Sequence, residues 1–146
     1  MAKVDTVVKN GKVVLHDGIL DAGVAIDKGK VVGLMPDAYL PEANEVIDAG
    51  GKYILPGCID PHAHLQRAYY TMEENIKSET RHAAVGGITT MVPMTFLRGE
   101  GMRPFADVYK EARPIVEDVA TIDMGFTFMV ARPGHVDEFE KCVHEY

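Results

Sequence analysis

Short runs of β-branched and apolar residues, separated by turn residues, fill the first 56 positions of the chain. This pattern predicts strands at 4–9, 12–15, 23–26, 30–34, 45–48 and 52–55. Asn10-Gly11 and Lys28-Gly29 are turn dipeptides between neighbouring strands, and the first is a strong hairpin signal. No His, Cys or acidic cluster in this stretch has the spacing of a metal site. We therefore expect a small sheet or half-sandwich with a structural role.

From Gly57 onward, apolar strands alternate with amphipathic helices, which is typical of parallel βαβ units in an α/β protein. Apolar side chains recur at helical spacing in three stretches, around 72–83, 105–112 and 136–146. We expect Pro114 to kink or end the second helix, and Asp137 and Glu138 to lie in the first turn of the third. One strand is predicted to begin at Cys58, and two further strands are predicted over 88–92 and over the alternating residues 122–130.

The composition is that of an ordinary globular protein, with 47% hydrophobic and 25% charged residues and a net charge of −7. A negative chain has no reason to bind nucleic acid or an anionic membrane. The sequence shows neither a transmembrane stretch nor the apolar core of a secretory signal, so a cytoplasmic location is the default expectation. Cys58 and Cys142 have no framework spacing, and we expect two buried free thiols.

His62-Ala63-His64, at the end of the strand that starts at Cys58, is the most informative chemical feature. Alternation along a strand would point Asp60, His62 and His64 to one face. Two imidazoles side by side form half of a divalent-metal site, and Asp60 could accept the spare ring N–H of a ligand. A His-x-His pair alone is a weak signal, because nearby histidines are more often surface or packed residues.

The residues around the pair strengthen this interpretation. The run Leu55-Pro56-Gly57-Cys58-Ile59-Asp60-Pro61-His62-Ala63-His64, followed by Gly86-Gly87-Ile88-Thr89-Thr90, resembles the amidohydrolase superfamily. Within it, the chain is most similar to the cyclic amidases, hydantoinases and dihydropyrimidinases. The resemblance implies a (β/α)8 TIM barrel after a small β-sandwich-like domain. A barrel needs about 31 residues per βα unit, so residues 57–146 would supply its first three units and residues 1–56 the N-terminal part of the sandwich-like domain.

The resemblance also implies two divalent metal ions, with zinc expected and manganese as the alternative. His62 and His64 match two metal ligands of the family, whereas the bridging carboxylated lysine, the other ligands and the proton-carrying aspartate find no match. Lys141 falls on a predicted helix and is not assigned as the bridging lysine. A metal-activated hydroxide would open a cyclic amide or imide ring of the hydantoin or dihydropyrimidine type. We expect the 146 residues alone to be inactive and aggregated, molten or oligomeric, with the rest of the barrel supplied as a continuation or a second polypeptide.

Substrate choice depends on the residues after His64. Dihydroorotases carry an arginine two positions after the second histidine, where this chain has Gln66, followed by Arg67. Side chains alternate along an extended strand, so Arg67 would not replace Gln66 in direction. The Leu65-Gln66 pair suits the hydantoinase pattern and predicts an uncharged ring as the small-molecule substrate. We also expect the protein to form a homodimer or homotetramer. The alternatives are a dihydroorotase, allantoinase, aminoacylase or deaminase, or a non-enzymatic scaffold, against which the retained histidine pair argues.

Overall fold

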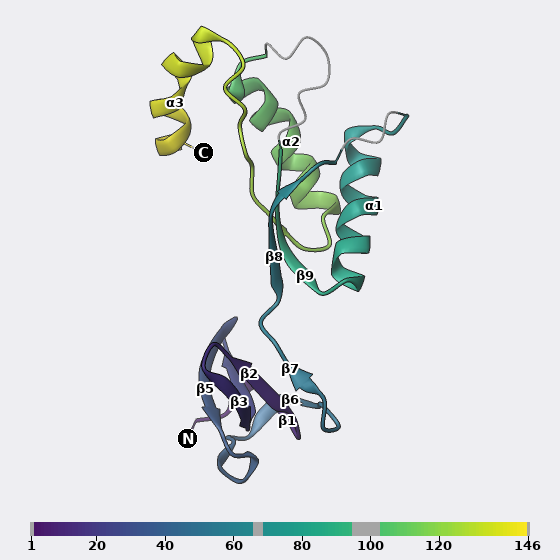
Figure 1. The fold of residues 1–146 in the computed structure, drawn as a ribbon, viewed down its shortest axis with the longest axis vertical. Helices are drawn as coiled ribbons and strands as arrows, with labels where there is room; N and C mark the ends of the chain where they lie inside the picture. The colour runs from purple at the N-terminus through teal and green to yellow at the C-terminus, as the bar shows by residue number, and fades with distance from the viewer. Residues whose placement is uncertain (1, 66–68, 95–102, 146) are drawn as a thin grey trace. The chain divides into compact units, whose positions relative to one another are not determined.

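The computed structural model describes residues 2–65, 69–94 and 103–145 of the chain. The chain forms two compact units, an N-terminal unit (Met1–Pro56) and a C-terminal unit (Gly57–Tyr146), drawn in Figure 1. Each unit has apolar core clusters of its own. None of the described helices is both long and apolar enough to cross a membrane.

The N-terminal unit is built from two small sheets. One has the strand order β5-β4-β1-β6 and the other β3-β2-β7. Val4, Val7 and Ala25 are buried in the first sheet, and a second buried cluster contains Val13 and Val24. The strands are β1 (Val4–Lys9), β2 (Lys12–Leu15), β3 (Gly18–Asp21), β4 (Gly23–Asp27), β5 (Lys30–Met35), β6 (Ala43–Asp48) and β7 (Tyr53–Ile54), with a 3-10 turn at Asp37–Tyr39.

One of the two predicted turns in this unit is confirmed and the other is wrong. Lys28 and Gly29, with φ of 49° and 72°, join the antiparallel strands β4 and β5. Asn10-Gly11 forms no hairpin, because β1 pairs with β4 and β6 while β2 pairs with β3 and β7. The Asn10 amide donates to Asp37 (2.7 Å) and its side chain to Asp48 (2.8 Å), which directs the chain from one sheet to the other.

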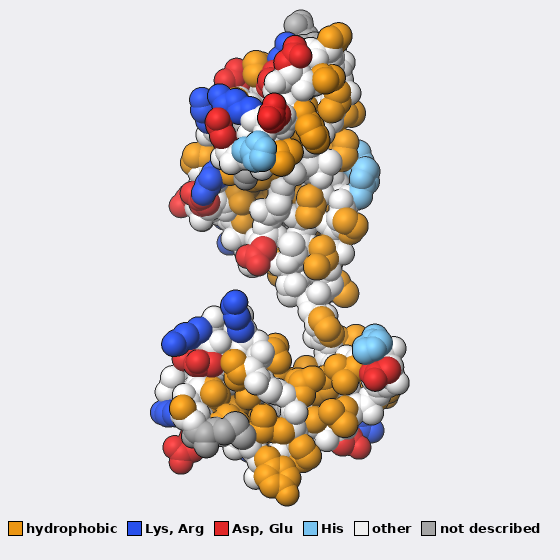
Figure 2. Space-filling view, turned by 90° about the vertical axis from the view of Figure 1, so that its left-hand side faces the viewer, with side chains coloured by type: hydrophobic (Ala, Val, Ile, Leu, Met, Phe, Trp, Pro, Cys, Tyr) orange, Lys and Arg blue, Asp and Glu red, His pale blue; other side chains and the backbone are white. Residues whose placement is uncertain are grey.

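The N-terminal unit also exposes much apolar surface, visible as orange atoms in Figure 2. Val31, Tyr53 and Leu55 are each at least 60% exposed. Strand β3 was not predicted, because all four of its residues are exposed and only its antiparallel pairing with β2 defines it.

The C-terminal unit has the predicted alternation of strands and helices. Its elements are β8 (Cys58–Ala63), α1 (Met72–Val85), β9 (Ile88–Pro93), α2 (Phe105–Val119), β10 (Asp123–Met124) and α3 (Pro133–Glu145). The strands form a parallel sheet in the order β10-β9-β8, and α1 and α2 lie side by side along it (Figure 1). Leu65, Ile76, Ala83, Met91 and Ala112 form the core between the sheet and these helices.

Three boundaries in this unit differ from the prediction. Pro114 does not end α2, because Ile115, Val116 and Val119 beyond it pack against the core. The third strand is regular only at Asp123–Met124, although the Thr127 amide still bonds to the Pro93 carbonyl (3.2 Å). Helix α3 begins at Pro133, a residue suited to a first turn, so no acidic residue lies in that turn.

The two cysteines are free, as predicted, but one is exposed and the other is half-buried. Cys58 is exposed because β8 is an edge strand of the described sheet. Cys142 is half-buried on α3, and its thiol has a raised pKa. Burial is the main cause, and the nearby carboxylates of Glu138 and Glu145 add to it. Our expectation that both thiols are buried is therefore wrong for Cys58.

Candidate metal centre

His62 and His64 meet at the carboxyl end of β8. Their Nε2 atoms lie 3.3 Å apart, and their rings are arranged edge to face with centroids separated by 5.1 Å. Both side chains are exposed. The structure therefore brings the two predicted ligands together, with the Nε2 atom of each ring within hydrogen-bond distance of the other.

The backbone around the pair departs from a regular strand. A step of three positions along β8, from Asp60 to Ala63, lies opposite a step of two positions along β9, which is the register shift of a β-bulge. Pro61 lies within this step and has no amide to donate to the ladder. The ladder resumes at Ala63, whose carbonyl accepts the Met94 amide (2.9 Å). Bulges of this kind redirect side chains and are frequent beside active sites.

Asp60 has a different partner from the one we predicted. Its Oδ1 accepts the backbone amide of His62 at 3.0 Å, the donor that the bulge leaves outside the ladder. Asp60 thus holds the main chain between the two histidines rather than a ring nitrogen. Its proposed contact with the spare ring N–H of a ligand stays a prediction.

The separation of the two Nε2 atoms fits a shared metal ion. Two zinc–nitrogen bonds of about 2.0–2.1 Å at the tetrahedral angle place their nitrogens about 3.3 Å apart. The observed distance of 3.3 Å equals this span and is also that of a hydrogen bond between the two rings. Within residues 2–65, 69–94 and 103–145, no group of three His, Cys, Asp or Glu side chains could hold a metal. Among the described residues the predicted ligand set is thus limited to the pair itself.

The other residues that we assigned to the site are less informative. Gln66 and Arg67 lie outside the described residues. In the described part of the same loop, Tyr69 is 99% exposed and Tyr70 44% exposed. His82, on α1, is a surface residue.

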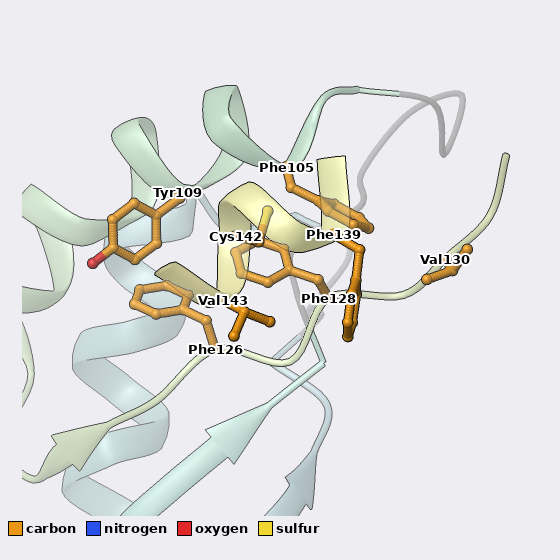
Figure 3. Close-up of a pocket in the computed structure, with 8 residues that line it drawn as sticks. All are labelled: Phe105, Tyr109, Phe126, Phe128, Val130, Phe139, Cys142 and Val143. Atoms are coloured by element: carbon orange, nitrogen blue, oxygen red, sulfur yellow. The ribbon is translucent and has the colours of Figure 1, made fainter. Parts of the chain in front are cut away.

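An aromatic cavity that the sequence did not reveal lies elsewhere in the C-terminal unit. It has a volume of about 240 Å³ and lies between α2, α3 and the segment after β10 (Figure 3). The ring of Phe105 lies tilted against that of Phe128 (centroids 4.9 Å apart), and Tyr109 meets Phe126 edge to face (5.2 Å). The helical spacing of α2 predicted that Phe105 and Tyr109 are buried, but gave no indication of this partner surface. The cavity contains none of the predicted site residues; it is lined by Phe105, Tyr109, Phe126, Phe128, Val130, Phe139, Cys142 and Val143.

Comparison with known proteins gives this geometry a context. The model of the Amidohydrolase family matches residues 45–98, which include both histidines. The L-hydantoinase of Paenarthrobacter aurescens is 38% identical over 115 residues, covering 74% of this chain and 24% of that protein. These matches support the assignment of the chain to the amidohydrolase family, as a segment similar to the N-terminal part of the hydantoinases.

Two further relatives extend the amidohydrolase match beyond residues 45–98. The allantoinase of Streptomyces avermitilis is 34% identical over 129 residues, which cover 86% of this chain and 28% of the allantoinase. The crystal structure of the dihydropyrimidinase from Brevibacillus agri superposes with a TM-score of 0.80 and 35% identity, covering 96% of this chain and 31% of the other. The chain therefore spans less than a third of the length of these relatives. Amidohydrolases are generally metal-dependent, which agrees with the chemistry of a histidine pair.

Proposed function

We propose that this chain contributes part of the active site of a metal-dependent hydrolase that opens the ring of a cyclic amide or imide. The observation that carries the proposal is the convergence of the His62 and His64 Nε2 atoms, 3.3 Å apart, at the carboxyl end of a parallel strand. Hydantoinases, dihydropyrimidinases and allantoinases among the relatives support the reaction class. We infer that β8, β9 and β10, with their helices, are the first three βα units of a TIM barrel, whose active sites lie at this end of the strands.

His62 and His64 would hold the metal through their Nε2 atoms, as neutral imidazoles that carry their proton on Nδ1. Zinc is the ion that we propose, with manganese as the alternative. The group held by the two histidines would supply Lewis-acid chemistry, which lowers the pKa of bound water to about 7 and polarises a carbonyl. The bond from the His62 amide to Asp60 keeps the backbone between the two rings in the geometry that lets them converge.

Two imidazoles bind a divalent ion weakly, because most stable sites use three or four protein ligands. The remaining ligands and the group that carries a proton to the leaving nitrogen must therefore come from outside the pair. We propose that residues 1–146 alone bind metal weakly and do not turn over substrate. Turnover would require the further barrel strands, joined to this chain or supplied as a second polypeptide.

For the substrate we propose an uncharged ring, of the hydantoin, dihydropyrimidine or allantoin type. The position where dihydroorotases grip a carboxylate with arginine holds Gln66 in this chain. A neutral amide offers hydrogen bonds but no charge to pair with a carboxylate. Assembly into a homodimer or homotetramer and a cytoplasmic location are further proposals.

Kinetics on the protein that contains this chain test the proposal. We would measure ring opening of hydantoin, dihydrouracil, allantoin and dihydroorotate before chelation, after chelation and after zinc is returned. We expect one of the uncharged rings to be opened, the rate to fall to background on chelation, and zinc to restore it. Full activity in the chelated protein would contradict the metal-dependent mechanism, and a large preference for dihydroorotate would contradict the substrate proposal alone.

A further inference from the structure

His135 is a histidine that the proposed chemistry does not use, and it is completely buried. It lies in the first turn of α3 with 0% of its surface exposed, and its ring stacks on Phe105 with centroids 4.2 Å apart. Nδ1 faces the backbone amide of Ala131 (3.1 Å), and Nε2 faces the carbonyl of Arg103 (2.9 Å). An amide only donates and a carbonyl only accepts, so these two hydrogen bonds need an acceptor at Nδ1 and an N–H donor at Nε2.

Glu138, one turn further along α3, binds the same part of α2. Its Oε2 accepts a hydrogen bond from the backbone amide of Phe105 (2.7 Å), and its Oε1 accepts one from the Arg132 guanidinium (2.9 Å). Helix α2 has Pro104 at its N-cap, a residue whose side chain cannot cap the first amides. Glu138 therefore caps α2 from another helix, where a negative charge also interacts favourably with the helix dipole.

We propose that His135 and Glu138 form a latch that docks α3 on the start of α2, and that protonation of His135 opens it. An imidazolium donates from both nitrogens, so its Nδ1–H would face the Ala131 amide, and that hydrogen bond would be lost. The surrounding charges are already paired: Arg103 with Glu111 (2.7 Å), and Arg132 with Glu138. Asp107 and Asp137, on the same two helices, are exposed to solvent.

The latch lies at the start of α2, and this position relates it to the strand beside the two site histidines. Helix α2 follows β9, and Met94, next to the end of β9, is bonded to Ala63 between the two site histidines. The latch thus holds the first turn of α2, the helix that follows β9, and β9 is the strand paired with β8. It rests on hydrogen bonds and burial alone, so its failure and the failure of the proposed hydrolase function are separable.

Amide hydrogen exchange, normalised to the intrinsic rate at each pH, tests the latch. The amides of Ala131 and Phe105 donate into it, and the Met94 amide in the β8–β9 ladder serves as an internal reference. As the pH is lowered from neutrality over the range in which the protein stays folded, we expect protection of Ala131 and Phe105 to fall about tenfold or more, and that of Met94 to stay.

Substitutions separate the latch from ordinary burial. His135→Phe keeps the stacking on Phe105 but removes both hydrogen bonds, so Ala131 should be unprotected at every pH. His135→Gln offers an acceptor and a donor with no titrating group, and it should restore part of the protection without the pH dependence. His82→Gln, at an exposed histidine of α1, is the matched control and should behave as the unmodified protein does.

A pH dependence of Ala131 protection that persists in His135→Gln would overturn the proposal. If His135→Phe fails to fold, nitrogen NMR of the unmodified protein decides instead. We expect the His135 ring to be protonated at Nε2 alone at neutral pH. A ring with its proton on Nδ1, or with protons on both nitrogens, would refute the latch.

Discussion

Two histidine environments in the C-terminal unit differ in what their ring nitrogens contact. His135 is buried, and backbone groups of Ala131 and Arg103 occupy both of its nitrogens. His62 and His64 are exposed, and their Nε2 atoms face each other across 3.3 Å. A nitrogen already bonded to the main chain has no lone pair or proton to offer a ligand, whereas two exposed, convergent nitrogens do. The same residue type is therefore a structural element in one place and a candidate ligand in the other.

The largest expected effect comes from breaking the exposed pair. His62→Ala or His64→Ala, in the protein that contains this chain, should lower kcat/KM for the ring substrate at least about a thousandfold. The reason is that the Lewis-acid contribution amounts to several kcal/mol, and about 1.4 kcal/mol corresponds to a factor of ten. Steady-state kinetics with saturating zinc measure the change.

Matched histidine controls keep that result specific. His82→Ala on α1 and His16→Ala in the N-terminal unit remove exposed histidines, and both should keep normal kinetics. A loss of activity in these controls equal to that of His62→Ala would remove the distinction between the pair and any other surface histidine.

Asp60 sharpens the comparison by separating the backbone from the rings. Asp60→Ala removes the acceptor for the His62 amide, and we expect metal affinity to fall by about 10–100-fold, the range for residues that support ligands. Asp60→Asn retains an oxygen acceptor, so it should lose less. Competition with a chromogenic chelator measures both affinities. Equal losses in the two variants would mean that the Asp60 charge matters, as in the predicted contact with a ring N–H.

Gly57, at the start of the site strand, tests how closely β8 must approach β9. A Cβ at this position would overlap the side chain of Thr89, whereas a Cβ at Gly86 would have no neighbour closer than 3.4 Å. We expect Gly57→Ala to lower the free energy of unfolding by about 1–3 kcal/mol, as overpacked sites do. Gly86→Ala should change it far less. Chemical denaturation gives both values, and equal stabilities of the two variants would show that β8 can shift freely.

The smallest effect is expected at the start of α1, away from both histidine environments. Thr71 and Glu74 form a capping box, and hydrogen bonds from the Thr71 amide, then from its hydroxyl, hold the pKa of Glu74 below its ordinary value. The stability that the ionised Glu74 contributes is fully present above the ordinary carboxyl pKa. It is lost as the pH falls through the lowered pKa of Glu74 in the folded protein. Thr71→Ala should cost about 1 kcal/mol of unfolding free energy at neutral pH.

Thermal unfolding over a pH series checks the capping box. The difference between Thr71→Ala and the unmodified protein should shrink as the solution becomes acidic, because Glu74 is then protonated in both. A difference that stays constant at all pH values would show that the ionised Glu74 is not part of the cap.

The sequence predicted the features that depend on local pattern. The strand–helix alternation after Gly57 and the meeting of His62 with His64 both follow from short-range periodicity. It failed where long-range pairing decides: Asn10-Gly11 joins two sheets because other strands occupy the edges of β1, and β10 ends early although its residues alternate to 130. The roles of His135 and Glu138 could not be predicted, because their partners Arg103 and Phe105 lie more than 30 residues away.

The central claim, that His62 and His64 together hold a divalent ion, is tested most directly by elemental analysis. In the purified protein that contains this chain, we would compare the metal content per chain of the unmodified form with those of His62→Ala, His64→Ala and the surface control His82→Ala. We predict that each site variant loses most of its zinc or manganese, while His82→Ala keeps the content of the unmodified protein. Normal metal content in both site variants would contradict the account.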